Sequence, residues 1–377
     1  MLYVLFFLIL LGILINIFAK RYILYNVYYK REISKKIVEI GEEFTITTTI
    51  ENRKLLPVTF LQIIEQLPSV LEYRFKIERF IVKGFFYHTM TFFLLPFQRI
   101  KRSYKAICNT RGRYIFGEVS LLGGDFLGLN VISQNFFLNQ EIIVLPKKID
   151  IEKEIIPYGD YNGDISVRRW IIDDPTMIIG IKEYTGQEPA KTIHWPLSLK
   201  HGELMVKNFD FTYENNSMII LNVECSKPYW LRIDEDGIEN CISIARGIGE
   251  IFYERKIPFG FVTNALIHGF SREENIIYPS SGDLHFSIFM EYLGRISYNV
   301  NLPLENILAS YLDKSSLIST YVIITPKVLK EYINYINSLK NDLNEIIVIS
   351  IYPDNLEFIS NRIIKYFTKR EDVAFIS

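Results

Sequence analysis

The feature that most constrains the fold is a change in periodicity near Ser217. From Val38 to about Asn109, short runs rich in β-branched residues alternate with turn signals, and no helical period is present. After Ser217, strand-like and helical runs alternate, as in Met218–Val223 followed by Asp236–Lys256. Strands alone favour a small β-sandwich, whereas a strand–helix–strand order favours a mostly parallel sheet with helices on both faces. We therefore expect an α+β multidomain protein.

An apolar run at the N-terminus predicts a membrane anchor. Leu2–Ala19 is apolar except for Asn16, and as a helix it would be roughly 27 Å long at ~1.5 Å per residue, close to the thickness of a hydrocarbon core. No basic residue precedes the run, and several follow it: Lys20, Arg21, Lys30, Arg31, Lys35 and Lys36. This bias places the folded body in the cytoplasm. We expect a single-pass transmembrane helix, with a cleaved signal or a buried core helix as alternatives.

These patterns divide the 377 residues into four parts. We expect a transmembrane anchor over 1–20, a β-sandwich over 38–145, a signature and linker region over 146–215, and an α/β domain over 216–377. A net charge of -1 removes the global electrostatic case for a nucleic-acid partner. The three cysteines, Cys108, Cys225 and Cys241, are far apart and odd in number, which argues against a disulfide framework or a zinc site.

The sequence shows no evident catalytic equipment. Cys225 follows a predicted strand, but no nucleophile elbow surrounds it and no dedicated base is identifiable. Gly247-Ile248-Gly249 lacks a third glycine and lies inside a helical period, which favours close helix packing over a dinucleotide loop. His194 and His201 flank Trp195 without metal-ligand spacing. We expect no enzyme activity and no cofactor; the rival is an enzyme that uses Cys225 or an unrecognised acid pair.

The densest polar and aromatic stretch is Ile179–Phe209, and it holds no nucleophile–base pair, metal-ligand cluster or phosphate loop. Such a signature without catalytic groups indicates a structural or recognition site. In this interpretation lysines pair with Glu183, Glu188 and Glu203, while Tyr184 and Trp195 supply apolar rings with polar tips. The network either forms a hinge between domains or presents a docking surface. Its candidate residues are Lys182, Glu183, Tyr184, Glu188, Lys191, Ile193, Trp195, Ser198, Lys200, Gly202 and Lys207.

This stretch resembles the signature of the family called domain of unknown function 58. The matching positions are Glu183, Tyr184, Lys191, Ile193, Trp195, Ser198, Gly202, Leu204, Val206, Lys207 and Phe209. An upstream motif also matches, at Arg111, Gly112, Tyr114, Asp125, Gly128 and Leu129. Three arginines of the family signature are lysines here, Lys182, Lys191 and Lys200, so the fork geometry of arginine is lost. Gly186-Gln187-Glu188 replaces Pro-Gly-Asp, and Leu199 replaces an alanine.

The resemblance implies a von Willebrand factor A-like, Rossmann-type domain after the signature. It also implies a membrane-anchored, non-enzymatic adaptor or scaffold that works with a MoxR-type AAA+ ATPase and other proteins in complex assembly or maturation. Metal-binding domains of this type need Asp-x-Ser-x-Ser, where this chain has Asn222-Val223-Glu224-Cys225-Ser226. We therefore expect no metal, with Asn222, Glu224 and Ser226 as a degenerate candidate set. The alternative is a metal-dependent ligand-binding protein.

Overall fold

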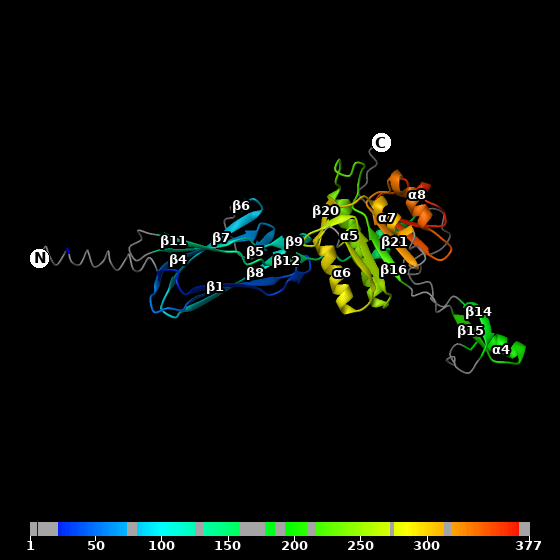
Figure 1. The fold of residues 1–377 in the computed structure, drawn as a ribbon, viewed down its shortest axis with the longest axis horizontal. Helices are drawn as coiled ribbons and strands as arrows, with labels where there is room; N and C mark the ends of the chain where they lie inside the picture. Colours follow the sequence, from blue (N-terminus) through cyan, green and yellow to red (C-terminus); the bar gives the residue numbers. More distant parts are fainter. Residues whose placement is uncertain are drawn as a thin grey trace. The chain divides into compact units, whose positions relative to one another are not determined.

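The computed structural model describes residues 6, 22–73, 81–124, 131–158, 178–184, 193–209, 216–271, 275–312 and 318–368. These residues form two compact units, one within Met1–Lys147 and one within Lys148–Ser377. Figure 1 shows both as ribbons, with the first unit in blue to green and the second in green to red.

Unit 1 is built from two antiparallel sheets and a small third sheet. The first has the order β1-β3-β8-β5, with β1 (Val27–Ile33), β3 (Phe44–Asn52), β8 (Arg99–Cys108) and β5 (Leu71–Tyr73). The second has the order β11-β10-β4-β7-β6, with β11 (Val131–Phe136), β10 (Val119–Gly124), β4 (Val58–Pro68), β7 (Phe85–Leu94) and β6 (Ile81–Val82). The third joins β2 (Ile37–Val38), β12 (Glu141–Val144) and β9 (Gly112–Ile115).

The strands of unit 1 follow from alternation of side chains. In β3 every second residue is buried, from Phe44 through Ile46 to Ile50, and in β4 the same period buries Leu61 and Ile63. Successive side chains of a strand point to opposite faces, so this period gives each sheet one apolar face. Apolar side chains from both sheets share common buried clusters, so the two sheets pack face to face.

Unit 2 contains a seven-stranded sheet with the order β13-β23-β22-β21-β16-β17-β19. Its strands are β13 (Ile155–Pro157), β16 (Ser217–Leu221), β17 (Phe259–Thr263), β19 (Ile276–Ser280), β21 (Thr320–Thr325), β22 (Glu345–Ser350) and β23 (Ile364–Thr368). The five inner strands run parallel, and β13 and β19 are antiparallel edges. Ile155–Pro157 falls in the predicted linker region, so part of that region belongs to this sheet.

Helices cover both faces of this sheet (Figure 1). On one face lie α7 (Leu304–Leu312) and α8 (Lys330–Leu339), which pack on Met218, Ile220 and Ile323. The opposite face carries α5 (Glu235–Glu254), which contacts β16, β21, α6 (Asp283–Arg295) and α2 (Ile151–Glu154). The two-stranded sheet β18 (Ala265–Ile267) and β20 (Ile296–Val300) and the short helix η3 (Leu356–Phe358) complete this part. A hairpin of β14 (Ile178–Glu183) and β15 (Met205–Phe209) with α4 (Trp195–His201) forms a separate small module.

The structure corrects the fold class predicted from the sequence. The part of the chain that the structure describes is strand-rich, with six sheets, and none of its helices is both long and apolar enough to cross a membrane. The 20-residue helix α5 is long enough, but it carries five acidic residues and is therefore too polar to cross a membrane. The predicted span Leu2–Ala19 lies outside the described residues apart from Phe6. The single-pass transmembrane helix, and the membrane localisation drawn from it, are therefore unsupported.

Candidate functional site

The seven-stranded sheet reverses its winding direction between β16 and β21. From β16 the chain crosses through α5 to β17 on one side, whereas β21, β22 and β23 follow one another on the other side. At such a point the loops that leave the carboxyl ends of two neighbouring strands diverge, and ligands of open α/β sheets bind in the crevice between them. Asn222 directly follows β16, and Thr325 ends β21. The topology alone therefore selects these residues as the candidate site of unit 2.

The crevice is filled by a closed network of buried side chains. Asn222 Nδ2 donates to Thr325 Oγ1 at 2.8 Å. Asn222 Oδ1 accepts from Asn264 Nδ2 at 2.7 Å and from the Glu224 backbone N–H at 2.9 Å. Asn264 Oδ1 in turn accepts from the Val223 N–H at 2.8 Å. Both side-chain amides are therefore satisfied by protein partners, as buried polar groups require.

Glu224 lies beside this network, and its residue is 0% exposed. Lys227 Nζ lies 3.1 Å from Glu224 Oε1 and 2.9 Å from Glu305 Oε2, so two carboxylates share one ammonium. The Leu304 N–H approaches Glu224 Oε2 at 3.5 Å. Burial raises the pKa of Glu224, and the hydrogen bond from Lys227 opposes that rise. Burial alone would lower the pKa of Lys227, but its hydrogen bonds to Glu305 and Glu224 outweigh this and raise it.

These residues do not fit a metal ion. Asn222 has committed its oxygen to two N–H donors, and Glu224 is bound to Lys227. Ser226 Oγ donates to the carbonyl oxygen of Pro228 at 3.1 Å. Among the described residues, no group of three or more His, Cys, Asp or Glu side chains could hold a metal. Asn222 and Glu224 of the degenerate set are thus held by hydrogen bonds and an ion pair within the protein, whereas Ser226 bonds to the backbone of the following loop.

Exposed aromatic and aliphatic side chains lie on the loop that follows this network, between β16 and α5. Trp230 is 71% exposed, Leu231 is similarly open, and the rings of Tyr229 and Trp230 meet edge to face with centroids 4.9 Å apart. The far end of the loop is held by Asp234, which caps α5 and accepts a hydrogen bond from Tyr352 at 2.7 Å. The sequence analysis missed this surface, although Pro-Tyr-Trp-Leu, separated by four residues from a predicted strand, is its signal.

The signature stretch folds into the module of β14, α4 and β15. His194 caps α4 by accepting the Leu197 N–H at Nδ1, 3.3 Å away. Ser198 Oγ accepts from the Met205 N–H at 2.8 Å and donates to the His194 carbonyl at 3.0 Å, which fastens α4 to the start of β15. Gly202 ends the helix at φ 77°, a left-handed conformation that favours glycine. The module is therefore held by its own backbone and polar contacts.

Two large apolar side chains of α4 lie on its surface. Trp195 is 60% exposed and Leu199 is 84% exposed. Residues four apart occupy neighbouring positions on one side of a helix, so these two form a single apolar face. A buried hinge would require an enclosed Trp195 ring, and the observed exposure does not support that interpretation.

The remaining signature residues are distributed around this module. Glu183, Lys200 and Glu203 are exposed, and Tyr184 and Ile193 are half-buried. In the hairpin, the backbone of Lys182 pairs with Val206 and that of Lys207 pairs with Ile181. Glu188 and Lys191 lie outside the described residues. Ion pairs between exposed side chains contribute little to stability, so these exposed charges do not form a buried ion-pair network that would hold two domains together.

The upstream motif forms the turn between β8 and β9. Arg111 is buried, and Gly112 has φ 150° at the start of β9. The Tyr114 hydroxyl donates to the Arg111 carbonyl at 3.1 Å, and a Cβ added at Gly112 would lie 3.1 Å from the Tyr114 hydroxyl oxygen. This geometry is a packed turn. Asp125 and Gly128 lie outside the described residues.

Unit 1 contains a buried carboxylate that the sequence analysis missed. Glu65 on β4 is 0% exposed and accepts hydrogen bonds from three hydroxyls of the opposite sheet: Thr48, Tyr29 and Tyr104. Burial, and then the charge of Glu65, raise the pKa of Tyr104, so its hydroxyl stays protonated and donates. Its position in the sequence could have revealed it, because Glu65 takes one of the alternating places of β4 whose side chains face the core. The cluster is a polar cross-link between sheets.

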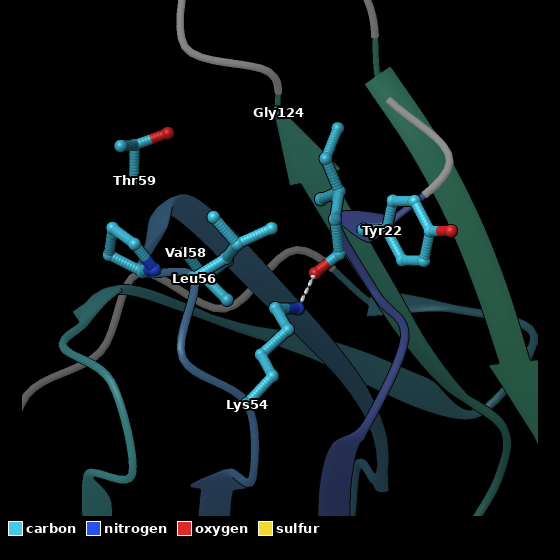
Figure 2. A pocket seen from close by; sticks show the side chains of 8 residues that line it. Tyr22, Lys54, Leu56, Val58, Thr59 and Gly124 are labelled. Carbon is cyan, nitrogen blue, oxygen red and sulfur yellow. Dashed lines mark hydrogen bonds between the residues drawn. The ribbon is translucent and has the colours of Figure 1, made fainter. Parts of the chain in front are cut away.

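A buried lysine of unit 1 lies beside a small pocket and donates a hydrogen bond to a backbone carbonyl oxygen, as Figure 2 shows. Lys54 Nζ donates to the carbonyl oxygens of Ile23 and Tyr25, the latter at 2.9 Å. Burial lowers the pKa of Lys54 to about 8. The adjoining cavity, lined by Tyr22, Leu56 and other side chains, has a volume of only about 10 Å³. A cavity of this volume holds about one water molecule and no larger ligand. The hydrogen bonds of Lys54 therefore serve to hold the chain at Ile23–Tyr25.

Comparisons with known proteins give one distant sequence relative and distant structural similarities. No family model matches the chain. It is 19% identical over 290 residues to the uncharacterised protein YeaD of Bacillus subtilis (strain 168), covering 76% of this chain and 67% of that protein. The CARDB domain of PF1109 from Pyrococcus furiosus is similar over 32% of this chain and 90% of its own, with 13% identity and a TM-score of 0.19. Native alpha-2-macroglobulin of Escherichia coli matches 32% of this chain and 24% of its own, with 11% identity and a TM-score of 0.24.

Proposed function

We propose that this chain is a non-enzymatic adaptor that binds a partner protein through the apolar face of α4. The observation that carries the proposal is the pair Trp195 and Leu199, which are 60% and 84% exposed. By the resemblance described above, the chain is a member of the domain of unknown function 58 family. The partner is then a MoxR-type AAA+ ATPase, and the process is assembly or maturation of protein complexes.

The arrangement of α4 suits docking better than a role in stability. An exposed tryptophan gives little to the stability of its own module, but tryptophan is among the residues that contribute most when a partner encloses them. Hydrogen bonds of His194 and Ser198 hold the start of the helix and tie it to β15, so the apolar face is presented on a fixed base. A short helix with paired apolar residues fits a groove on a partner. The replacement of alanine by Leu199 enlarges this face.

The surroundings of Cys225 support a non-enzymatic role over the thiol-enzyme alternative. Its Sγ donates to the Val223 carbonyl at 3.6 Å, and burial raises the pKa of the thiol. A nucleophilic cysteine needs a lowered pKa, because the thiolate is the reactive form. Cys225 therefore remains a thiol at neutral pH and packs beside the crevice.

The test is a binding measurement with purified full-length chain and a MoxR-type AAA+ ATPase from the same organism. Trp195→Ala and Leu199→Ala should each weaken the affinity at least tenfold, since loss of an interface anchor costs about 2 kcal/mol or more. Melting temperatures should not change, because both side chains are exposed. Trp230→Ala is the matched control, because it has the same residue type and similar exposure but lies on the loop between β16 and α5. Unchanged affinity of Trp195→Ala would refute the proposal, and loss only in Trp230→Ala would move the docking surface to that loop.

A further inference from the structure

The switch-point crevice of unit 2 contains a carboxylate that must be neutralised from within the protein. Glu224 is 0% exposed and lies at the carboxyl end of β16, where sheets of this topology bind ligands. An ionised carboxylate without water or a positive partner is strongly destabilising. The described surroundings of Glu224 hold Asn222, the Leu304 N–H and Glu305, and the last of these is itself acidic. One cationic group, Lys227, faces this set.

Lys227 places its ammonium between two carboxylates. Its Nζ lies 3.1 Å from Glu224 Oε1 and 2.9 Å from Glu305 Oε2. Glu224 and Lys227 are three residues apart, whereas Glu305 comes from the start of α7, so the ammonium ties two distant segments together. The lysine side chain is 22% exposed, which places it at the mouth of the crevice with Glu224 beneath.

We propose that the ammonium of Lys227 is the resident cation of this crevice. It is the shared counter-ion of Glu224 and Glu305, keeps the site closed to divalent ions, and anchors the beginning of the loop that carries Trp230 and Leu231. Removing the lysine side chain would leave two carboxylates around a vacated cation position. Hard divalent ions such as Ca²⁺ and Mg²⁺ prefer carboxylate oxygens, so the vacated position would bind them. This inference is independent of the docking role of α4.

The first test is the charge requirement, measured as the melting temperature of the full chain. Lys227→Met keeps the length of the side chain without its charge and should lower the melting temperature on the order of 10 °C, because a buried carboxylate is left unpaired. Adding Glu224→Gln to Lys227→Met should restore more than half of the loss. Lys227→Arg keeps the charge and should melt closer to the parent than Lys227→Met does. Lys327→Met is the matched control, because Lys327 forms an exposed pair with Asp354 at 3.0 Å.

The second test is the gain of cation binding. Millimolar CaCl₂ or MgCl₂ and an excess of EDTA should leave the melting temperature of the parent unchanged. CaCl₂ should raise that of Lys227→Ala by several degrees, and the double variant Lys227→Ala with Glu224→Gln should lose this response. If Lys227→Ala does not fold, the melting temperatures of Lys227→Met, Lys227→Arg and the double variant Lys227→Met with Glu224→Gln test the proposal instead. A metal-dependent melting temperature in the parent would overturn the proposal. So would a Lys227→Met variant that melts within about 2 °C of the parent, or a folded Lys227→Ala variant without a calcium response.

Discussion

Tyr104 donates a 2.8 Å hydrogen bond to Glu65 across the two sheets of unit 1. The two residues lie on β8 and β4, which belong to different sheets. Thr48 and Tyr29 donate to the other oxygen of the same carboxylate. Three hydroxyls of one sheet thus converge on a single buried acid of the other, and each retains its proton for that purpose.

Glu65→Gln should destabilise unit 1 by about 1–3 kcal/mol. Glutamine keeps the shape, but its NH₂ group replaces one acceptor oxygen, so at least one buried hydroxyl loses its acceptor. Urea denaturation followed by hydrogen exchange of β4 amides would measure the change. Glu72→Gln, at an exposed position of β5, is the control. Equal stability of the two variants would show that the cross-link contributes nothing.

Ser198→Ala should loosen the signature module, whereas Leu199→Ala should leave it intact. The alanine removes the acceptor of the Met205 N–H, and a lost partner costs about 1–3 kcal/mol when the donor is buried. Leu199 is 84% exposed, so its truncation removes no buried contact. Hydrogen exchange at Met205 should accelerate only in Ser198→Ala. Equal exchange in both variants would contradict the role given to this serine.

The stability of unit 2 should fall below neutral pH because of His285. Its Nε2 donates to the Phe259 carbonyl at 2.6 Å, and burial lowers its pKa from the usual 6.5. The unfolded chain therefore binds a proton more readily, so this contribution is present above the unfolded pKa of 6.5 and is lost as the pH falls from there through the lower pKa of the folded state. His285→Gln should reduce the fall in melting temperature between pH 7.5 and 5.5 by at least half. An unchanged pH profile in this variant would exclude His285 as the cause.

Gly249→Ala should destabilise the contact between α5 and α6 by about 1–3 kcal/mol through overpacking. An added Cβ would lie 2.2 Å from Cε1 of Phe289, which is fully buried between Phe259 and Phe261 and cannot move aside. Thermal melts would measure the loss, with Glu254→Ala on the exposed end of α5 as control. A gain in stability from the better helix propensity of alanine would disprove the close contact.

Many elements of both units could be predicted because their signals are local. The alternation in Phe44–Ile50 predicted β3, and the helical period from Ile238 to Phe252 predicted α5. The position of Gly247 and Gly249 within that period indicated close packing, and Ile151 and Phe289 supply the neighbours. The predicted membrane anchor failed as an inference from composition, since the described helices include none that could span a bilayer.

The candidate sites depended on what packing brings together. The sequence by itself determined that Glu224 and Lys227 stand three residues apart after a strand. It also determined that Glu65 has a core-facing position in the alternation of its strand, and that Trp195 lies within the polar and aromatic stretch Ile179–Phe209. Tertiary structure alone decided that Glu305, about 80 residues away, shares the lysine, that Tyr104 meets Glu65, and that Trp195 lies exposed. The physical reason is that periodicity reports which face of an element a side chain occupies, whereas partners and burial depend on which other face packs against it.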